Sequence, residues 1–375
     1  MYLESAVFEN FRNIDHHPFG FKQGMNILFG GNAQGKTSVI EGIYLFAGGK
    51  SFRRAKDKEM IKNDKNFSQV SIGFSDSRRD NKMAVRTYRD MKKELFMNGV
   101  KLKKMSEFVG NFKAVLFCPE HLAIVRDEPS LRRNFVDSAI SQIKPKYLSA
   151  LIEYGKLTEN KNALLRNPEN YSPDEFENLY SLYSQRIAKG SAYITSVRTE
   201  YLARLFEYVR TFLLEMTSGA DTVGYDYIST AGDVSDIASL ESRYIDLIFG
   251  NAEREKAAKT SLFGAHRDDF DIKLPIGTAK IFASQGQQRS IALAMKLAEG
   301  EICREETGEY PVFLFDDVLS ELDRQRKNYI LGNLSGKQVI VTSCDEADFS
   351  DCKAAQKIYV ENGEFFYDVD NYKRR

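Results

Sequence analysis

The chain has 375 residues, a formal net charge of zero, and 42% hydrophobic and 12% aromatic residues. This composition indicates a globular protein with two lobes or domains and excludes a disordered chain. No apolar run approaches the ~20 residues of a membrane-spanning helix. Because the N-terminus also lacks a secretion signal, we expect a cytoplasmic protein without a membrane partner.

A phosphate-binding loop is the first motif along the chain. Residues 30–37 read GGNAQGKT and fit G-x-x-x-x-G-K-[ST], between an apolar strand at 25–29 and a helical pattern at 38–46. Lys36 would reach the β- and γ-phosphates, and Thr37 would offer a hydroxyl to Mg²⁺. A glycine-rich turn that matches by chance is the alternative. The predicted nucleotide-binding residues are Gly30, Gly31, Asn32, Ala33, Gln34, Gly35, Lys36, Thr37 and Ser38.

Charge is distributed unevenly along the chain. Basic residues outnumber acidic ones between residues 50 and 65 and between 82 and 104, whereas acidic residues predominate from 299 to 323. A basic face on the N-terminal part would hold a phosphodiester backbone, and an ordinary solvated surface explains the same charges equally well. The candidate DNA-contacting residues are Lys50, Arg53, Arg54 and Lys56.

Two further signals organise the first half. Asn98-Gly99 between short apolar runs predicts a β-hairpin. From Pro119 the pattern becomes helical, and Ser172-Pro173-Asp174-Glu175 predicts a helix start with a capping box. The apolar spacing from residue 176 to 212 then predicts one helix of roughly 65 Å with a bend at Gly190. A helix through residues 147–154 is its expected partner in a short helical arm.

Strand and helix patterns alternate in the last third of the chain. Strands are expected at 223–228, 269–274, 312–315 and 338–341, with helices at 287–304 and 324–331. This alternation predicts a largely parallel, buried sheet. The four cysteines, Cys118, Cys303, Cys344 and Cys352, lack paired spacing, so we expect buried thiols in a reducing cytoplasm and no zinc site.

An apolar strand at 312–315 ends in Asp316 and Asp317. Because ligands gather at the carboxyl ends of parallel strands, both acids are expected beside the phosphate loop. Asp316 is the predicted Mg²⁺ partner together with Thr37, and Asp317 is the predicted catalytic residue that orients the attacking water, together with Lys36.

A Ser-x-Gly-Gln sequence starts the helix before that strand, at Ser284, Gln285, Gly286 and Gln287. Its hydroxyl and N–H groups suit a γ-phosphate, and an ordinary serine N-cap is the alternative. The order of phosphate loop, Ser-Gly-Gln sequence, acidic strand and Ser320-Glu321-Leu322-Asp323 resembles an ATP-binding-cassette head. That resemblance implies that Ser284–Gln287 form a signature acting in trans, that Ser320 and Asp323 form a D-loop, and that each chain holds half of each ATP site.

The chain resembles the RecF family over nearly its whole length. The matching stretches are FENFRN at 8–13, GNAQGKT at 31–37, KSFRR at 50–54, RRNFVD at 132–137, GAHRDD at 264–269 and SQGQQR at 284–289. His121 and Ala265 depart from the family pattern, which leaves the local behaviour of those two loops open. Glu120 is a candidate counterpart of a transporter Q-loop residue.

The resemblance implies an α/β P-loop ATPase head of the ABC type with an inserted, mainly helical second lobe. We expect the head at residues 1–117 plus 257–375 and the helical lobe with its short antiparallel arm at 118–256. The implied protein binds ATP, Mg²⁺ and DNA, forms an ATP-dependent homodimer, and hydrolyses ATP slowly with stimulation by DNA. With RecO and RecR it would help to load RecA on gapped DNA.

Three other classes of protein share parts of this pattern. A transporter subunit would carry a histidine after the acidic strand, and all four histidines of this chain precede Asp316. A chromosome-organising protein would need a far longer coiled coil than residues 120–255 allow. A binding module with an inactive ATPase is disfavoured by the presence of Lys36, Thr37, Asp316 and Asp317.

Overall fold

The structure is a computed structural model that describes residues 1–126, 128–319, 322–344 and 355–367. The chain forms two compact units, one of residues 1–123, 211–221 and 289 onward, the other of 124–210 and 222–288. The expected boundaries differ from this grouping at three places, and at the first of them residues 118–123 group with the first unit. Residues 257–288 group with the helical unit because strand β10 (Asp269–Leu274) pairs with β9 (Gly224–Ile228). Residues 211–221 group with the first unit, where Glu215 accepts a hydrogen bond from Tyr329.

A parallel sheet forms the centre of the first unit, as predicted for the strands expected at 312–315 and 338–341, whereas the strands expected at 223–228 and 269–274 pair antiparallel in the second unit. Its strands at 25–29, 114–117, 312–316 and 339–343 are almost entirely buried, because both faces are covered. One antiparallel strand, β15 (Glu364–Phe366), closes its edge. The parallel strands, in spatial order, are β14 (Gln356–Glu361), β3 (Met25–Phe29), β13 (Val339–Ser343), β12 (Val312–Asp316) and β8 (Ala114–Phe117).

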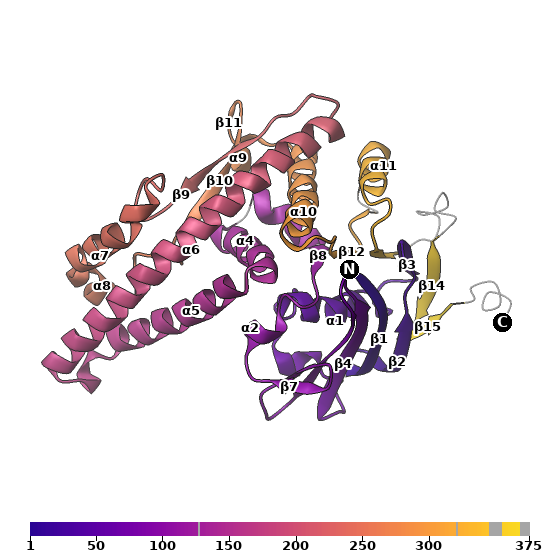
Figure 1. Ribbon diagram of the computed structural model, residues 1–375, viewed down its shortest axis with the longest axis horizontal. Helices are drawn as coiled ribbons and strands as arrows, with labels where there is room; N and C mark the ends of the chain where they lie inside the picture. The colour runs from indigo at the N-terminus through magenta and orange to yellow at the C-terminus, as the bar shows by residue number, and fades with distance from the viewer. Residues whose placement is uncertain (127, 320–321, 345–354, 368–375) are drawn as a thin grey trace. The chain divides into compact units, whose positions relative to one another are not determined.

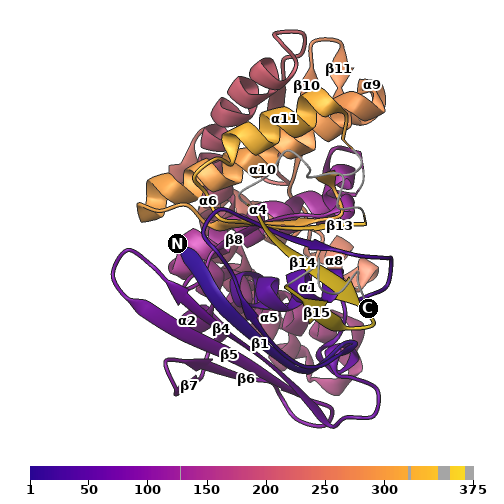
Figure 2. The same cartoon turned by 90° about the vertical axis from the view of Figure 1, so that its right-hand side faces the viewer.

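An antiparallel sheet forms a second layer of the same unit (Figure 2). Its hairpin turn at Asn98-Gly99 has positive φ values of 49° and 81°, which confirms the predicted turn and explains the glycine. In spatial order the strands are β2 (Ile14–Gly20), β1 (Tyr2–Phe11), β4 (Phe67–Ser75), β5 (Asp80–Tyr88), β6 (Glu94–Met97) and β7 (Val100–Leu102).

Helix α1 (Lys36–Gly48) packs against both sheets and is buried on nearly all sides. Gly42 allows this approach, because a methyl group there would lie 2.2 Å from the ring of Phe8. Helix α10 (Gln285–Thr307) packs on β12 in the same way, with Gly300 against the ring of Phe313. The remaining helical elements of the unit are η1 (Asp57–Met60), α2 (Met105–Phe108), α3 (Pro119–Leu122) and α11 (Arg324–Asn333).

The second unit contains the predicted arm (Figure 1). Helix α6 (Pro173–Met216) starts at the predicted capping box, in which Ser172 and Glu175 exchange hydrogen bonds. Helix α5 (Pro145–Arg166) runs antiparallel to it. Helix α6 is continuous through Gly190, the expected position of a bend, and the missing side chain there makes room for the ring of Tyr154.

The rest of the second unit consists of shorter helices and a small sheet. Among them β9, β10 and β11 (Gly277–Thr278) form a small antiparallel sheet. The helical elements are η2 (Ala123–Val125), α4 (Pro129–Ile143), η3 (Pro168–Asn170), η4 (Ile237–Ser239), α7 (Leu240–Gly250), α8 (Ala252–Ala258) and α9 (Ala279–Phe282). None of the described helices is both long and apolar enough to cross a bilayer.

Candidate nucleotide site

The phosphate loop connects the end of β3 to the start of α1. Its backbone has positive φ at Gly30, Ala33 and Gly35, with values of 151°, 62° and 118°. Gly35 is the N-cap of α1, and no described side chain caps the helix there. The first N–H groups of α1 and the positive end of its dipole therefore face the loop, which is the arrangement that binds phosphate.

Lys36 lies over this loop. Its Nζ donates hydrogen bonds to the carbonyl oxygens of Gly30 and Gly31, both at 2.7 Å, and its side chain is buried. The ammonium therefore bonds to neutral oxygens rather than to a carboxylate. A positive charge in this environment suits an anionic ligand.

Thr37 and Asp316 meet at the carboxyl end of the parallel sheet. The Oγ1 of Thr37 donates to Oδ1 of Asp316 at 2.9 Å, and Oγ1 of Thr342 donates to the same oxygen at 2.9 Å. Burial raises the pKa of Asp316, and the charges of Asp317 and Glu120 raise it further. A divalent cation would relieve this cost, because it favours the charged carboxylate.

The donor set at this point fits Mg²⁺. No group of three His, Cys, Asp or Glu side chains among the described residues is placed to hold a metal. Mg²⁺ does not need such a group, because it usually takes one or two protein oxygens and completes its shell with phosphate and water. The Thr37 hydroxyl and the Asp316 carboxylate supply oxygens of that kind.

Asp317 follows Asp316 with a positive φ of 56°, and its backbone N–H donates to Thr342 Oγ1 at 3.0 Å. Cys344 Sγ lies 2.8 Å from Asn32 Oδ1 and 3.8 Å from an Asp317 carboxylate oxygen. The prediction of buried thiols is therefore wrong for Cys344, which is exposed because it follows the last residue of β13. It is confirmed for Cys118 and Cys303, and Cys352 lies outside the described residues.

The Ser-Gly-Gln sequence starts α10. Ser284 Oγ accepts from Gln287 N at 3.2 Å, and Gln287 Oε1 accepts from Ser284 N at 3.0 Å, which together form a capping box. Ser284 is therefore the N-cap of α10, as the alternative interpretation predicted. It leaves Ser284 and Gln285 exposed at a helix N-terminus.

The predicted D-loop is only partly described. Ser320 lies outside the described residues. Asp323 is the N-cap of α11, where its Oδ1 accepts from Arg326 N at 2.9 Å. This backbone hydrogen bond is the main cause that lowers the pKa of Asp323.

The candidate DNA-contacting segment follows α1. Its four cations, Lys50, Arg53, Arg54 and Lys56, are exposed. Glu41, which is fully buried on α1, anchors the segment: it accepts hydrogen bonds from Ser51 Oγ at 2.5 Å and from Arg12 Nε at 2.8 Å. The cations are thus presented on a fixed loop.

Two positions at the site were missed from the sequence. Asn13, at the β1–β2 turn, donates from Nδ2 to the Gln34 carbonyl and accepts from Ser38 Oγ, both at 3.1 Å. Thr342 bonds to Asp316 as described above. Thr342 had a usable signal, because it is a polar residue near the end of a buried strand. Asn13 had none, since its contact depends on how two distant segments pack.

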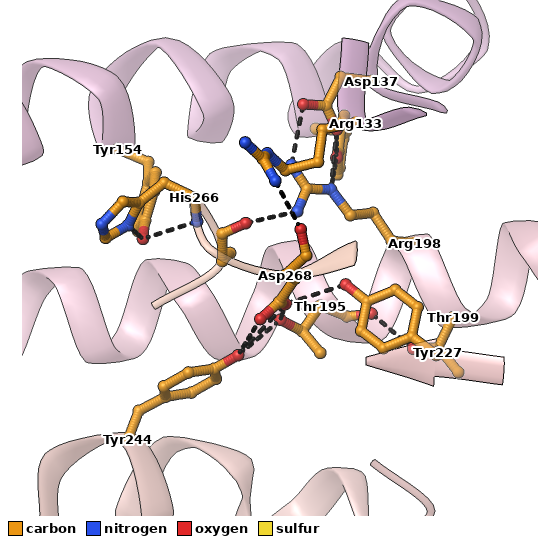
Figure 3. A network of polar contacts seen from close by, with 12 residues as sticks. Arg133, Asp137, Tyr154, Thr195, Arg198, Thr199, Tyr227, Tyr244, His266 and Asp268 are labelled. Atoms are coloured by element: carbon orange, nitrogen blue, oxygen red, sulfur yellow. Dashed lines mark hydrogen bonds and ion pairs between the residues drawn. The ribbon is translucent and has the colours of Figure 1, made fainter. Parts of the chain in front are cut away.

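A dense polar network lies apart from these residues, in the core of the second unit (Figure 3). Arg198 forms paired hydrogen bonds with Asp137, both at 2.8 Å, and donates to the Ala265 carbonyl at 2.7 Å. Asp268 accepts from Thr195 at 2.7 Å and from Tyr227 at 2.9 Å. These groups satisfy one another, so the network holds α4 and α6 to the segment that leads into β10.

Comparison with known proteins agrees with this geometry. Residues 2–365 match the family model described as RecF/RecN/SMC N terminal domain. The "DNA replication and repair protein RecF" of Clostridium perfringens is 36% identical over 342 residues, which cover 91% of this chain and 92% of that protein. The protein of the same name from Clostridium acetobutylicum is 35% identical over 371 residues, covering 99% and 98%.

Solved structures give the same result. The structure of "the recombination mediator protein RecF-ATP in RecFOR pathway" has a TM-score of 0.90 at 33% identity and covers 97% of both chains. The Smc head bound to the C-winged helix domain of ScpA has a TM-score of 0.55 at 15% identity, which shows a shared fold alone. Fold and site thus define an ABC-type ATPase head of the RecF/RecN/SMC class. Within that class, the chain belongs to the RecF family.

Proposed function

We propose that this chain is a Mg²⁺-dependent ATPase of DNA replication and repair. The observation that carries the proposal is the 2.9 Å contact between Thr37 and Asp316 beside Lys36, since it joins the two predicted halves of an Mg·ATP site. The names of its relatives support the repair role, and the RecF–ATP structure supports the nucleotide.

Residue roles follow from the geometry. Residues 30–38 bind the triphosphate through backbone N–H groups, and Lys36 binds the β- and γ-phosphates. Thr37 and Asp316 hold Mg²⁺, which when bound offsets charge on the phosphate oxygens. Asp317 orients the attacking water. Glu120, whose charge reaches Asp316, acts near the same cation.

A second copy completes the site in this proposal. Ser284, Gln285, Gly286 and Gln287 present N–H groups and a hydroxyl at the start of α10 to the γ-phosphate held by the partner, and Ser320 and Asp323 belong to the D-loop. ATP therefore drives dimerisation, and slow, DNA-stimulated hydrolysis reverses it. Lys50, Arg53, Arg54 and Lys56 contact DNA, and the protein acts in the cytoplasm with RecR and RecO to load RecA at gaps.

Light scattering with ATP or ADP, with and without duplex and gapped DNA, tests this proposal. We expect monomers with ADP, dimers with ATP, and more dimer when DNA is present. A protein that binds ATP and stays monomeric under all of these conditions would refute the trans arrangement.

Ser284 offers a matched pair of variants. Asp and Asn are both good N-caps, so Ser284→Asp and Ser284→Asn should retain the fold of α10. Ser284→Asp should abolish ATP-dependent dimerisation, because a carboxylate would face the partner's γ-phosphate, while Ser284→Asn should dimerise. Equal dimerisation of both variants would remove Ser284 from the interface.

A further inference from the structure

We propose that the turn between β14 and β15, at Asn362 and Gly363, is a positioning element for the phosphate loop and that it acts through Gln34. The inference rests on the proposed function, because it assumes that the loop binds ATP. It assigns the side chain of Gln34 a positioning role, where the sequence predicted a nucleotide-binding residue.

The turn donates hydrogen bonds to the side chain and to the backbone carbonyl of Gln34. Asn362 N donates to the Gln34 side-chain Oε1 at 2.5 Å, and Gly363 N donates to the Gln34 carbonyl oxygen at 2.9 Å. Gln34 Nε2 donates to the Asn32 carbonyl at 3.2 Å. The amide group of Gln34 is therefore committed at both its oxygen and its nitrogen to the protein itself.

A second turn, between β1 and β2, also bonds to the phosphate loop. Asn13 Nδ2 donates to the same Gln34 carbonyl at 3.1 Å. Gly35 lies against this side chain, since a methyl group there would be 2.9 Å from Asn13 Nδ2. One carbonyl oxygen thus receives hydrogen bonds from two turns that are more than 300 residues apart in the sequence.

Close packing leaves no space for side chains at these contacts. A methyl group on Gly363 would lie 2.7 Å from the Asn13 carbonyl oxygen, and one on Gly30 would lie 2.2 Å from the Val360 carbonyl oxygen in β14. A side chain at Gly363 would therefore press on Asn13, which bonds to Gln34, and one at Gly30 would press on β14. The β14–β15 hairpin therefore supports the phosphate loop at its start and at its middle.

This support has a consequence for binding. A glycine-rich loop loses much conformational entropy when it closes around a ligand. Holding the loop in its phosphate-binding shape before ATP arrives removes part of that cost and raises affinity. Loosening the turn should weaken ATP binding without removing any group that touches ATP.

The chain contains a matched control for this test. Asn98-Gly99 and Asn362-Gly363 are two Asn-Gly hairpin turns with nearly equal backbone angles, φ 49° and 81° against 51° and 79°. Nothing lies within 4 Å of a methyl group placed on Gly99. Gly99→Ala and Gly363→Ala therefore impose the same backbone strain, and only Gly363→Ala also disturbs the phosphate loop.

The experiment compares affinity for a fluorescent ATP analogue in the full-length variants, with thermal unfolding measured in parallel. We expect Gly363→Ala to weaken binding about tenfold and Gly99→Ala to leave it within about twofold. Gln34→Ala should weaken binding similarly. Gln34→Ala removes the hydrogen bond from Asn362 N and Gly363→Ala disturbs the one from Gly363 N to the Gln34 backbone carbonyl. Because both changes loosen the same turn from the same residue, the double variant Gln34→Ala/Gly363→Ala should lose less than the sum of the two single variants.

Three outcomes separate the hypotheses. Equal affinities of Gly363→Ala and Gly99→Ala would overturn the positioning role while leaving the proposed ATP site intact. Full additivity of Gln34→Ala and Gly363→Ala would overturn the route through Gln34. Absence of binding by the unmodified protein and by Gly99→Ala would instead refute the proposed function.

Discussion

Two aspartates show how differently the two units use buried charge. Asp316 in the first unit accepts hydrogen bonds from two hydroxyls and lies near two further carboxylates, so burial and repulsion raise its pKa. Asp268 in the second unit is almost fully buried and accepts from the hydroxyls of Thr195, Tyr227 and Tyr244 and from the backbone N–H of Thr230. Asp268 is thus satisfied by groups of the protein itself, whereas Asp316 is the acid at which we propose a cation.

The cations differ in the same way. Lys36 bonds to two carbonyl oxygens, whereas Arg198 is paired with the carboxylate of Asp137. A group with an unusual pKa is often taken as a sign of a functional site. In this molecule the second unit has many such groups, and they stabilise the fold. Among the described residues, Lys36 and Asp316 of the candidate nucleotide site have no ion-pair partner.

The largest expected effect concerns the second unit. Arg198→Ala should lower the free energy of unfolding by about 3–5 kcal/mol, because it removes a buried guanidinium whose paired hydrogen bonds hold the partly buried carboxylate of Asp137. Tyr227→Phe, which removes one hydrogen bond to Asp268, should cost about 1 kcal/mol. Urea unfolding measures both changes. ATP affinity of folded Tyr227→Phe should equal that of the unmodified protein, and a large loss would give this network a role in nucleotide binding.

The second largest expected effect is that of removing the buried cation Lys36 of the first unit. Lys36→Ala should weaken ATP binding by about 2–4 kcal/mol, since it removes a charge that the phosphates would contact. Its effect on stability should be small, because Lys36 pairs with no carboxylate in the described part of the chain. Titration with a fluorescent ATP analogue gives the affinity, with the exposed Lys22→Ala as the control. Unchanged binding by Lys36→Ala would contradict the assignment of the phosphate loop.

A pH dependence of stability is expected from a buried histidine of the second unit. His266 accepts from Tyr154 Oη at Nδ1, 2.7 Å away, and burial lowers its pKa to about 4. Between pH 6.5 and 4 the unfolded chain therefore binds more protons, so the free energy of unfolding should fall as pH falls through this range, by up to about 3 kcal/mol.

Urea unfolding at several pH values tests this dependence. His266→Gln should flatten the curve between pH 4 and 6.5, because it removes the titrating group. A curve that keeps its full slope in the variant would show that other groups cause it.

The smallest expected effect concerns the exposed cations. Replacing Arg53 and Arg54 by Glu should weaken DNA binding and reduce the salt slope by about one unit for each lost phosphate contact. The same replacements at Arg78 and Arg79, exposed on the β4–β5 turn, provide the matched control. If the control pair has the larger effect, the DNA surface lies on that turn instead.

Much of the site was predictable because its parts are local. The phosphate loop, the capping boxes at Ser172 and Ser284, and the Asn98-Gly99 turn depend on residues within a few positions of one another. The parallel sheet was also predictable from alternating strand and helix patterns. The packing at Gly190 was not predictable, because the local pattern does not show that the ring of Tyr154 lies there.

By itself, then, the sequence determined which segments are expected to bind phosphate, that Thr37 and Asp316 should lie near each other, and which family the chain resembles. Tertiary structure alone decided that Thr342 joins Thr37 at Asp316 and that Gln34 is held by turns from both ends of the chain. It also grouped residues 257–288 with the helical unit. The reason is physical: such contacts depend on the order in which strands pair, and spacing within a segment does not encode that order.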